Sequence, residues 1–320
     1  MSSSSAAYLV SGATGHQGGS VVRDLLKAGY RVHALVRDPT KPAAKELESL
    51  GAILFVGDYS NAEAINKATV GVKGVFINPV PDFTNPKGEA EQTQRFVDAA
   101  VAAGTVEHLV VSTVFRVDYY IKWLTAHPDH PFVAFYGSKR AVEDVVRTSG
   151  VKHWTVLRPP WLMHNYLFPQ SNFHYPKLHT ERLFSTALTR DAGIAHLDAE
   201  DIGRWTAAAF AHPETFAGKE IDLAAENVTP EEAVSAISKV AGVEIATSFF
   251  EPADVLKDAA EGDFMAPFRA AAAQIQNEAG GAISSEDLVA LKGYGIPFTT
   301  FAEFLEKNKS AVLATLKIDS

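Results

Sequence analysis

The chain contains no cysteine among its 320 residues. Disulfide bonds, thiolate catalysis and cysteine-ligated metals are therefore excluded, and a reducing compartment is consistent with this absence. No apolar run approaches the ~20 residues that a membrane-spanning helix needs. The leading residues, MSSSSAA, lack the basic and apolar regions of a signal peptide. We therefore expect a soluble, cytoplasmic protein with no membrane partner.

Positive charge is also scarce. The chain has 29 Lys and Arg residues against 38 Asp and Glu residues, which gives a formal net charge of −9. Nucleic-acid-binding domains are usually basic, so no nucleic-acid partner is expected. The 11 histidines show no H-E-x-x-H or similar spacing, and we therefore expect no metal site.

A glycine-rich turn near the N-terminus organises the rest of the chain. An apolar strand (8–10) leads into the turn, and an apolar pattern of helical period follows and ends at Gly29. In this context glycines let backbone N–H groups approach a pyrophosphate, and the helix N-terminus adds positive potential. The alternative is a plain strand-to-helix corner. The expected cofactor-binding residues of the turn are Gly12, Thr14, Gly15, His16, Gln17 and Gly18.

Strand-like and helix-like segments then alternate. The pattern predicts an α/β fold with a doubly wound parallel Rossmann sheet and right-handed crossovers. Residues 114–132 and 161–190 show no regular pattern and are rich in aromatic residues and histidine. The expected strands are 30–36, 53–56, 74–78, 109–113, 154–157, 220–223 and 245–249, and the expected helices are 45–50, 61–70, 89–103, 135–149 and 201–211.

These segments suggest two parts. We expect a Rossmann domain at 6–160, to which 195–230 returns, and a smaller, discontinuous C-terminal lobe, 161–194 with 231–320, which covers the substrate. Within the lobe, Thr229 is expected to cap a helix whose first residue is Pro230.

Several motifs resemble the NmrA-like family of atypical short-chain dehydrogenase/reductases. The resemblance implies an NADP(H)-binding extended Rossmann domain with a small C-terminal lobe. The family includes reductases, redox-sensing regulators and proteins of fungal secondary metabolism. The motifs are GATGHQGGS (12–20), VRDP (36–39), GD (57–58), SK (138–139), LRPPWLMHN (157–165), DIGR (201–204) and NVTPEE (227–232).

The end of the second strand decides between NADP and NAD. Arg37 stands at this end and Lys41 follows four residues later. A guanidinium suits the 2′-phosphate of NADP, whereas an acidic residue would bind the 2′-hydroxyl of NAD. Asp38 leaves the NAD interpretation open, but we favour NADP(H).

Three further residues follow expected strands. The resemblance implies that Asp58 holds the adenine amino group, with Tyr59 beside the ring. A turn-forming role for Asp58 is the alternative. Asn78 is expected near the nicotinamide-side ribose, or it simply forms a turn.

The expected catalytic centre departs from the larger superfamily, in which a tyrosine stands four residues before a lysine. Here Phe135 precedes Lys139 by four residues, and Tyr136 precedes it by three. Because one residue rotates an α-helix by ~100°, Tyr136 cannot take the place of the usual tyrosine. The resemblance implies that Lys139 binds the nicotinamide ribose. A surface ion pair between Lys139 and Glu143 is the alternative.

Other polar residues are expected to line the substrate-binding part of the site. His164 follows the Arg-Pro-Pro segment, and with Tyr136 it is a candidate for proton transfer. Glu89 is either an acid or base, or simply a helix-start residue. The surrounding residues suggest a pocket for a bulky, aromatic or apolar ligand: Ser112, Thr113, Tyr120, Lys122, Trp123, Asn165, Tyr166, His174 and His179.

The leading hypothesis is an NADP(H)-dependent oxidoreductase acting on a bulky, aromatic small metabolite in secondary metabolism, with Lys139, Tyr136 and His164 as catalytic residues. Two alternatives keep the cofactor without net redox chemistry. One is a regulator that senses NADP/NADPH through a protein partner, and the other is an acid–base catalyst, for example of a cyclisation. The missing tyrosine motivates both alternatives.

Overall fold

The computed structural model describes residues 6–82, 84–260 and 262–318. The chain divides into two compact units, which we treat separately. The first comprises the part up to Ile121, Ala134–Pro159 and Ala199–Leu223. The second comprises Lys122–Val133, Pro160–Asp198 and the part from Ala224 onward. The sequence placed the returning segment at 195–230, whereas in the structure it is Ala199–Leu223, and 122–133, which the sequence placed in the Rossmann domain, belongs to the second unit.

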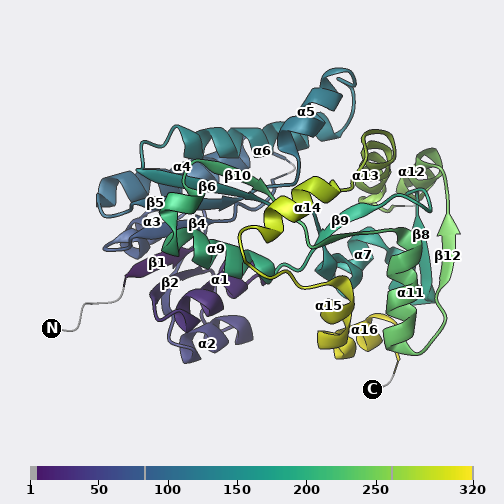
Figure 1. The fold of residues 1–320 in the computed structure, drawn as a ribbon, viewed down its shortest axis with the longest axis horizontal. Coiled ribbons are helices and arrows are strands. Elements are labelled where there is room, and N and C mark those ends of the chain that lie inside the picture. Colours follow the sequence, from purple (N-terminus) through teal and green to yellow (C-terminus); the bar gives the residue numbers. More distant parts are fainter. Residues whose placement is uncertain (1–5, 83, 261, 319–320) are drawn as a thin grey trace. The chain divides into compact units, whose positions relative to one another are not determined.

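A seven-stranded sheet forms the centre of the first unit (Figure 1). All its neighbouring strands pair in parallel, in the order β10-β6-β5-β4-β1-β2-β3. The predicted doubly wound parallel sheet is therefore confirmed. The order reverses between β1 and β4, and in such sheets ligands bind at the carboxyl ends of the strands beside this point. The strands are β1 (Ala7–Val10), β2 (Arg31–Val36), β3 (Ile53–Val56), β4 (Gly74–Ile77), β5 (His108–Ser112), β6 (His153–Arg158) and β10 (Lys219–Asp222).

The helices between these strands cover both sheet faces. Gly29 and Gly104 end two of them in the left-handed conformation, with φ of 82° and 63°, as C-terminal glycines commonly do. The helices are α1 (His16–Lys27), α2 (Pro42–Ser49), α3 (Ala62–Thr69), α4 (Gly88–Ala103), α5 (Val117–Thr125), α6 (Phe132–Arg147), α9 (Asp201–Ala211) and α10 (Pro213–Phe216).

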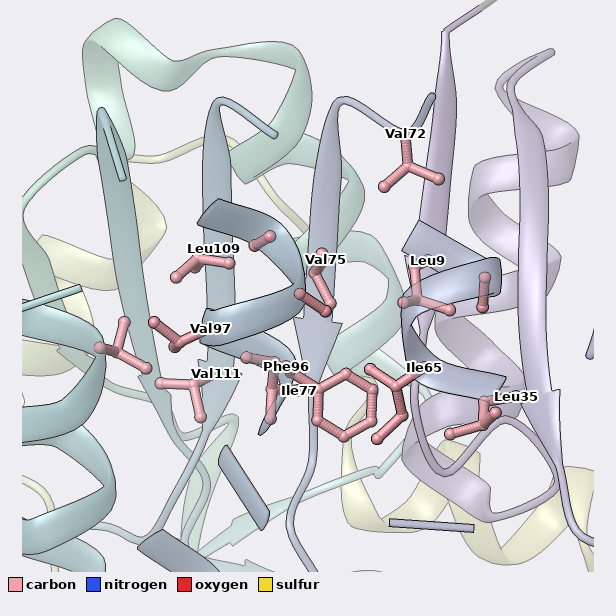
Figure 2. Close-up of a cluster of buried hydrophobic side chains, with 14 of the residues drawn as sticks. Leu9, Leu35, Ile65, Val72, Val75, Ile77, Phe96, Val97, Leu109 and Val111 are labelled. Atoms are coloured by element: carbon pink, nitrogen blue, oxygen red, sulfur yellow. The ribbon is translucent and has the colours of Figure 1, made fainter. Parts of the chain in front are cut away.

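One face of the sheet packs against α3, α4 and α6. Figure 2 shows Phe96 and Val97 of α4 and Ile65 of α3 against side chains of the central strands. The strand residues in this cluster include Leu9, Val75, Ile77, Leu109 and Val111, which are fully buried. Strands buried on both faces read as continuous apolar runs, which explains why the sequence pattern identified them.

The other face requires glycine at two positions where α9 packs closely. A Cβ on Gly74 would lie 2.6 Å from the ring of Phe210, which stacks on Tyr8 with centroids 4.4 Å apart. A Cβ on Gly203 would lie 2.6 Å from the backbone oxygen of Ser20, so α9 approaches α1 almost backbone to backbone. The DIGR motif therefore has a packing role.

The second unit contains short elements and two small sheets. β11 pairs antiparallel with β9, β7 pairs with β9 in parallel, and β12 pairs with β8 in parallel. The first elements are β7 (Trp161–Leu162), the 3₁₀ helix η1 (Met163–Tyr166), α7 (Ser171–His174), α8 (Pro176–Glu181), β8 (Leu183–Thr186) and β9 (Ile194–Leu197). The later elements are β11 (Glu226–Val228), α11 (Pro230–Ala241), β12 (Ala246–Phe249), α12 (Pro252–Ala260), α13 (Ala266–Ala279), α14 (Ser285–Lys292), α15 (Phe301–Lys307) and α16 (Lys309–Thr315).

Two expectations for the irregular stretches were wrong. Residues 161–190 contain two strands and three short helices, and α5 occupies 117–125 within the stretch 114–132. These elements are too short to show a clear period, and their aromatic residues are placed by tertiary packing. The helix start at Thr229 is confirmed, because its side chain accepts from the Glu232 N–H in a capping box with Pro230 at the first position.

Two buried histidines make folding sensitive to acid. Thr155 Oγ1 donates to the Phe216 carbonyl at 2.9 Å, so it accepts from Nε2–H of His108, also at 2.9 Å. His196 Nδ1–H donates to the Ile194 carbonyl at 2.7 Å, which leaves Nε2 to accept from a tyrosine hydroxyl at 2.9 Å. Both rings are therefore neutral, and burial lowers the pKa of each to about 4.

We expect stability to be constant above about pH 6.5 and to fall as the pH drops from 6.5 toward 4. In that window the unfolded histidines bind protons that the folded ones do not, so protonation favours unfolding. His108→Gln keeps a donor for Thr155 and should flatten the decline, whereas exposed His212→Gln should not. Urea midpoints at pH 7.5, 6 and 5 test this, and parallel declines for all three proteins would contradict it.

Candidate functional site

The glycine turn between β1 and α1 has no room for a side chain at position 18. Gly12 has φ of 60°, and its carbonyl accepts from the Gly15 N–H at 3.0 Å. A Cβ on Gly18 would lie 2.2 Å from the Gly12 oxygen and 2.8 Å from the Ser11 oxygen. Since both oxygens belong to the backbone, the turn excludes any residue but glycine at position 18.

The first turn of α1 is suited to an anion. Its N-cap residue is Gly15, so no side chain caps the helix, and its first turn contains no acidic residue. The positive end of the helix dipole is therefore not neutralised within this turn, which suits it to a phosphate. Thr14 and His16 lie exposed on this turn. The Gln17 side chain is directed toward the end of β5, where its Oε1 accepts a hydrogen bond from Ser112 Oγ at 2.7 Å.

The ends of β1 and β4 are joined by polar contacts beside the point where the sheet order reverses. The Asn78 N–H donates to Ser11 Oγ at 2.9 Å, and the Tyr59 hydroxyl donates to the Asn78 carbonyl at 2.7 Å. The Tyr59 ring also packs edge-on against Phe96 at 5.7 Å. Burial raises the pKa of Tyr59. Tyr59 and Asn78 thus meet Gly12, from which a Cβ would reach the Tyr59 hydroxyl at 3.0 Å.

Basic side chains lie exposed at the end of β2. Arg37 and Lys41 are both exposed, and the Arg37 charge contributes to lowering the pKa of Asp58. Asp38 is occupied in a local turn, because its Oδ1 accepts from Thr40 Oγ1 and N–H at 2.6 and 2.8 Å, and these bonds lower its pKa. The arrangement therefore favours the basic pair over Asp38 as the group that would meet the adenosine ribose.

Asp58 forms a turn of the same kind. Its Oδ1 accepts from Ser60 Oγ at 2.6 Å and from the N–H groups of Ser60 and Asn61 at 2.8 and 3.2 Å. These hydrogen bonds are the main reason that its pKa is lowered. The turn-forming interpretation therefore describes Asp58 Oδ1, and a role toward adenine would use the other carboxylate oxygen.

Lys139 lies in a buried ion pair. Its Nζ contacts Glu89 Oε1, and both side chains are less than a tenth exposed. Ser138 Oγ donates to the other oxygen of Glu89 at 2.8 Å. The surface pair of Lys139 with Glu143 is therefore wrong, and Glu89 is more than a helix-start residue. The sequence feature that points to Glu89 as the partner of Lys139 is its position as an acidic residue at the start of the helix that follows β4.

Phe135 occupies the helix position that the superfamily gives to tyrosine. Lys139 Nζ lies 5.3 Å from the centre of its ring, as expected for residues one turn apart. Tyr136 is buried instead, with its ring 5.0 Å from that of Tyr120, and burial raises its pKa well above the ordinary value. Tyr136 therefore holds its proton at neutral pH.

The model of the NmrA-like family matches residues 5–305. The chain belongs to this family. It is 35% identical over 172 residues to the NmrA-like family domain-containing oxidoreductase ptmS of Penicillium ochrochloron, and the match covers 51% of this chain and 49% of ptmS. The chain thus spans about half the length of that relative.

Two solved structures show the same fold. The NADPH-dependent quinone oxidoreductase QOR2 of Escherichia coli, complexed with NADPH, has a TM-score of 0.71 at 24% identity, covering 94% of this chain and 99% of that one. NmrA, described as a negative transcriptional regulator in complex with NADP, has a TM-score of 0.71 at 20% identity, covering 95% of each chain. One is an enzyme and the other a regulator, so the NmrA-like fold alone does not determine activity.

A buried charge network in this NmrA-like chain was missed by the sequence analysis. Arg158 forms two hydrogen bonds with Glu143, at 2.9 and 2.7 Å, and another with Glu220 at 2.5 Å. Thr113 Oγ1 donates to the same Glu143 at 2.9 Å. The network ties the ends of β5, β6 and β10 to α6. The signal was Arg158 within a buried strand, since a buried arginine needs partners.

His164 belongs to the second unit, while Lys139 and Tyr136 belong to the first. It is buried, with its Nδ1 3.8 Å from Asp198 Oδ1 and its ring edge-on to Phe304. Tyr166 is buried in the core of the second unit. Within the residues that the structure describes, no helix has both the length and the apolar character to cross a bilayer.

Proposed function

We propose that this NmrA-like chain is an NADP(H)-dependent oxidoreductase that acts on a bulky, aromatic small metabolite of secondary metabolism. The observation that carries the proposal is the glycine turn, in which position 18 has no space for a side chain, followed by an α1 N-terminus without a side-chain cap. The exposed pair Arg37 and Lys41 supports NADP over NAD. The relative ptmS is named an oxidoreductase, and QOR2 binds NADPH.

The chain's own residues would act as follows. The N–H groups at the start of α1 hold the pyrophosphate, and Arg37 with Lys41 holds the 2′-phosphate. Lys139, fixed by Glu89, donates hydrogen bonds to the nicotinamide ribose. The bound cofactor supplies a hydride from the C4 position of its nicotinamide. His164 is the candidate for moving the proton, whereas Tyr136, whose raised pKa keeps its hydroxyl protonated, is a candidate for donating a hydrogen bond to the substrate.

Incubation with both C4-deuterated NADPH diastereomers and a pool of aromatic ketones, quinones and imines tests the proposal. We expect deuterium from one diastereomer in one product, detected by mass spectrometry. A new product without deuterium would contradict hydride transfer and support acid–base chemistry. NADPH binding with no product from any compound would favour a regulator.

The regulator is the second candidate because Phe135 replaces the superfamily's proton-donating tyrosine, and because NmrA itself is described as a regulator. In that case Lys139→Ala should only weaken cofactor binding. In either enzymatic case it should remove turnover.

A further inference from the structure

The second unit contains a pocket that the cofactor argument does not use. All its lining residues belong to that unit, and its empty volume is about 760 Å³, including the open mouth. Its walls come from β7, from α7 and α8, from β8 and the residues after it, and from one side of α13.

The α13 wall is fixed in place by Asn277. Its Oδ1 accepts from the Thr189 N–H at 3.0 Å, and its Nδ2 donates to the Ala187 carbonyl at 2.8 Å. These bonds join α13 to the segment that follows β8. Phe250 continues the same wall, since its N–H donates to the Thr186 carbonyl at 3.1 Å. Hydrogen bonds to the backbone therefore hold the walls from α13 and from Phe250 against the end of β8 and the segment that follows it.

The charge of Arg269 in the pocket wall is neutralised by an acidic neighbour. Arg269 forms two hydrogen bonds with Asp263, at 3.2 and 2.6 Å, and a third with the Phe173 carbonyl at 3.1 Å. Burial, followed by the Arg269 charge, lowers the pKa of His174 to about 4, so this histidine is neutral at pH 7. Lys177 adds a cation to the wall. An anion would therefore gain little from Arg269 or His174.

The pocket lining also contains aromatic rings and residues with polar atoms that lack hydrogen-bond partners. Trp161 lies edge-on to His174 with centroids 4.6 Å apart, and Tyr175, Phe250 and Phe268 supply further rings. Trp161 Nε1, Ser185 Oγ and Gln276 Oε1 are buried and make no hydrogen bond within the described part of the chain. Buried polar groups without partners are costly, so a ligand that supplies the partners gains affinity.

We propose that this pocket binds an uncharged ring compound with a hydrogen-bond acceptor, such as a carbonyl, beside an N–H or O–H donor. The acceptor pairs with the indole N–H of Trp161, and the donor with Ser185 or with the amide of Gln276. Flat rings pack between the aromatic walls. The proposal stands apart from the redox function, because it concerns binding without any dinucleotide.

Calorimetry on the whole chain, without dinucleotide, tests the proposal with 2-quinolinone, a neutral bicyclic lactam. Naphthalene serves as the apolar control and quinoline-2-carboxylate as the charged control. We expect 2-quinolinone to bind at least tenfold more tightly than either. Equal or tighter binding of naphthalene would overturn the role of the polar atoms, and tighter binding of the carboxylate would overturn the uncharged class.

Variants locate the site. Trp161→Phe and Gln276→Met keep the apolar bulk but remove the donor or the acceptor, and each should weaken binding about tenfold. Gln274→Met is the matched control on α13, because Gln274 is not part of the pocket lining. Its affinity should equal that of the wild type. Unchanged affinity in both test variants, or no binding of 2-quinolinone up to its solubility, would overturn the proposal.

Discussion

Gly18→Ala is expected to reduce NADPH affinity by at least about 100-fold, equivalent to ~2.7 kcal/mol. The new Cβ would lie 2.2 Å from the Gly12 oxygen and 2.6 Å from the Gly12 carbonyl carbon. Because these are backbone atoms, the turn itself must move, and with it the N–H groups at the start of α1. Fluorescence titration with NADPH measures the effect, and thermal unfolding monitors the fold.

Gly29→Ala is the matched control for this turn. Gly29 ends α1 at the helix's other terminus with φ of 82°, and a Cβ there meets nothing within 4 Å. The variant carries only backbone strain of about 1 kcal/mol, so NADPH affinity should stay near that of the wild type. An affinity of Gly18→Ala within about threefold of the wild type would contradict the assignment of the turn.

Lys139→Ala is expected both to abolish turnover and to destabilise the fold by about 3–5 kcal/mol, because it leaves the Glu89 carboxylate buried without its cation. Ser138 would remain its hydrogen-bond donor. Glu89→Gln should destabilise for the converse reason. Urea unfolding measures the stability, and turnover is measured with the compound identified by deuterium transfer.

The double variant Glu89→Gln/Lys139→Met separates the two effects. It removes both charges at similar volume, so most of the lost stability should return while turnover stays at least about 100-fold down. Lys73→Met is a control in an exposed pair with Glu107, where the loss should be below about 1 kcal/mol. Wild-type turnover in the double variant would contradict a functional role for Lys139.

The parallel sheet could be predicted because its signal is local and repeated. Buried strands such as 74–78 are short apolar runs, and glycines such as Gly29 and Gly104 end the intervening helices. The prediction for residues 161–190 was wrong for the opposite reason, because the signal there is not local. Its strands β7 and β8 are two and four residues long, and they are specified by partners such as β9 and β12 that lie far along the chain.

The sequence by itself determined the family, the doubly wound sheet and the position of the glycine turn, because each depends on residues that are neighbours along the chain. Only the tertiary structure decided which charges meet. Lys139 pairs with Glu89, 50 residues away, and not with Glu143, four residues away. Glu143 is held by Arg158 of the neighbouring strand. Burial selects these partners, since a desolvated charge requires its counter-ion wherever the fold places one.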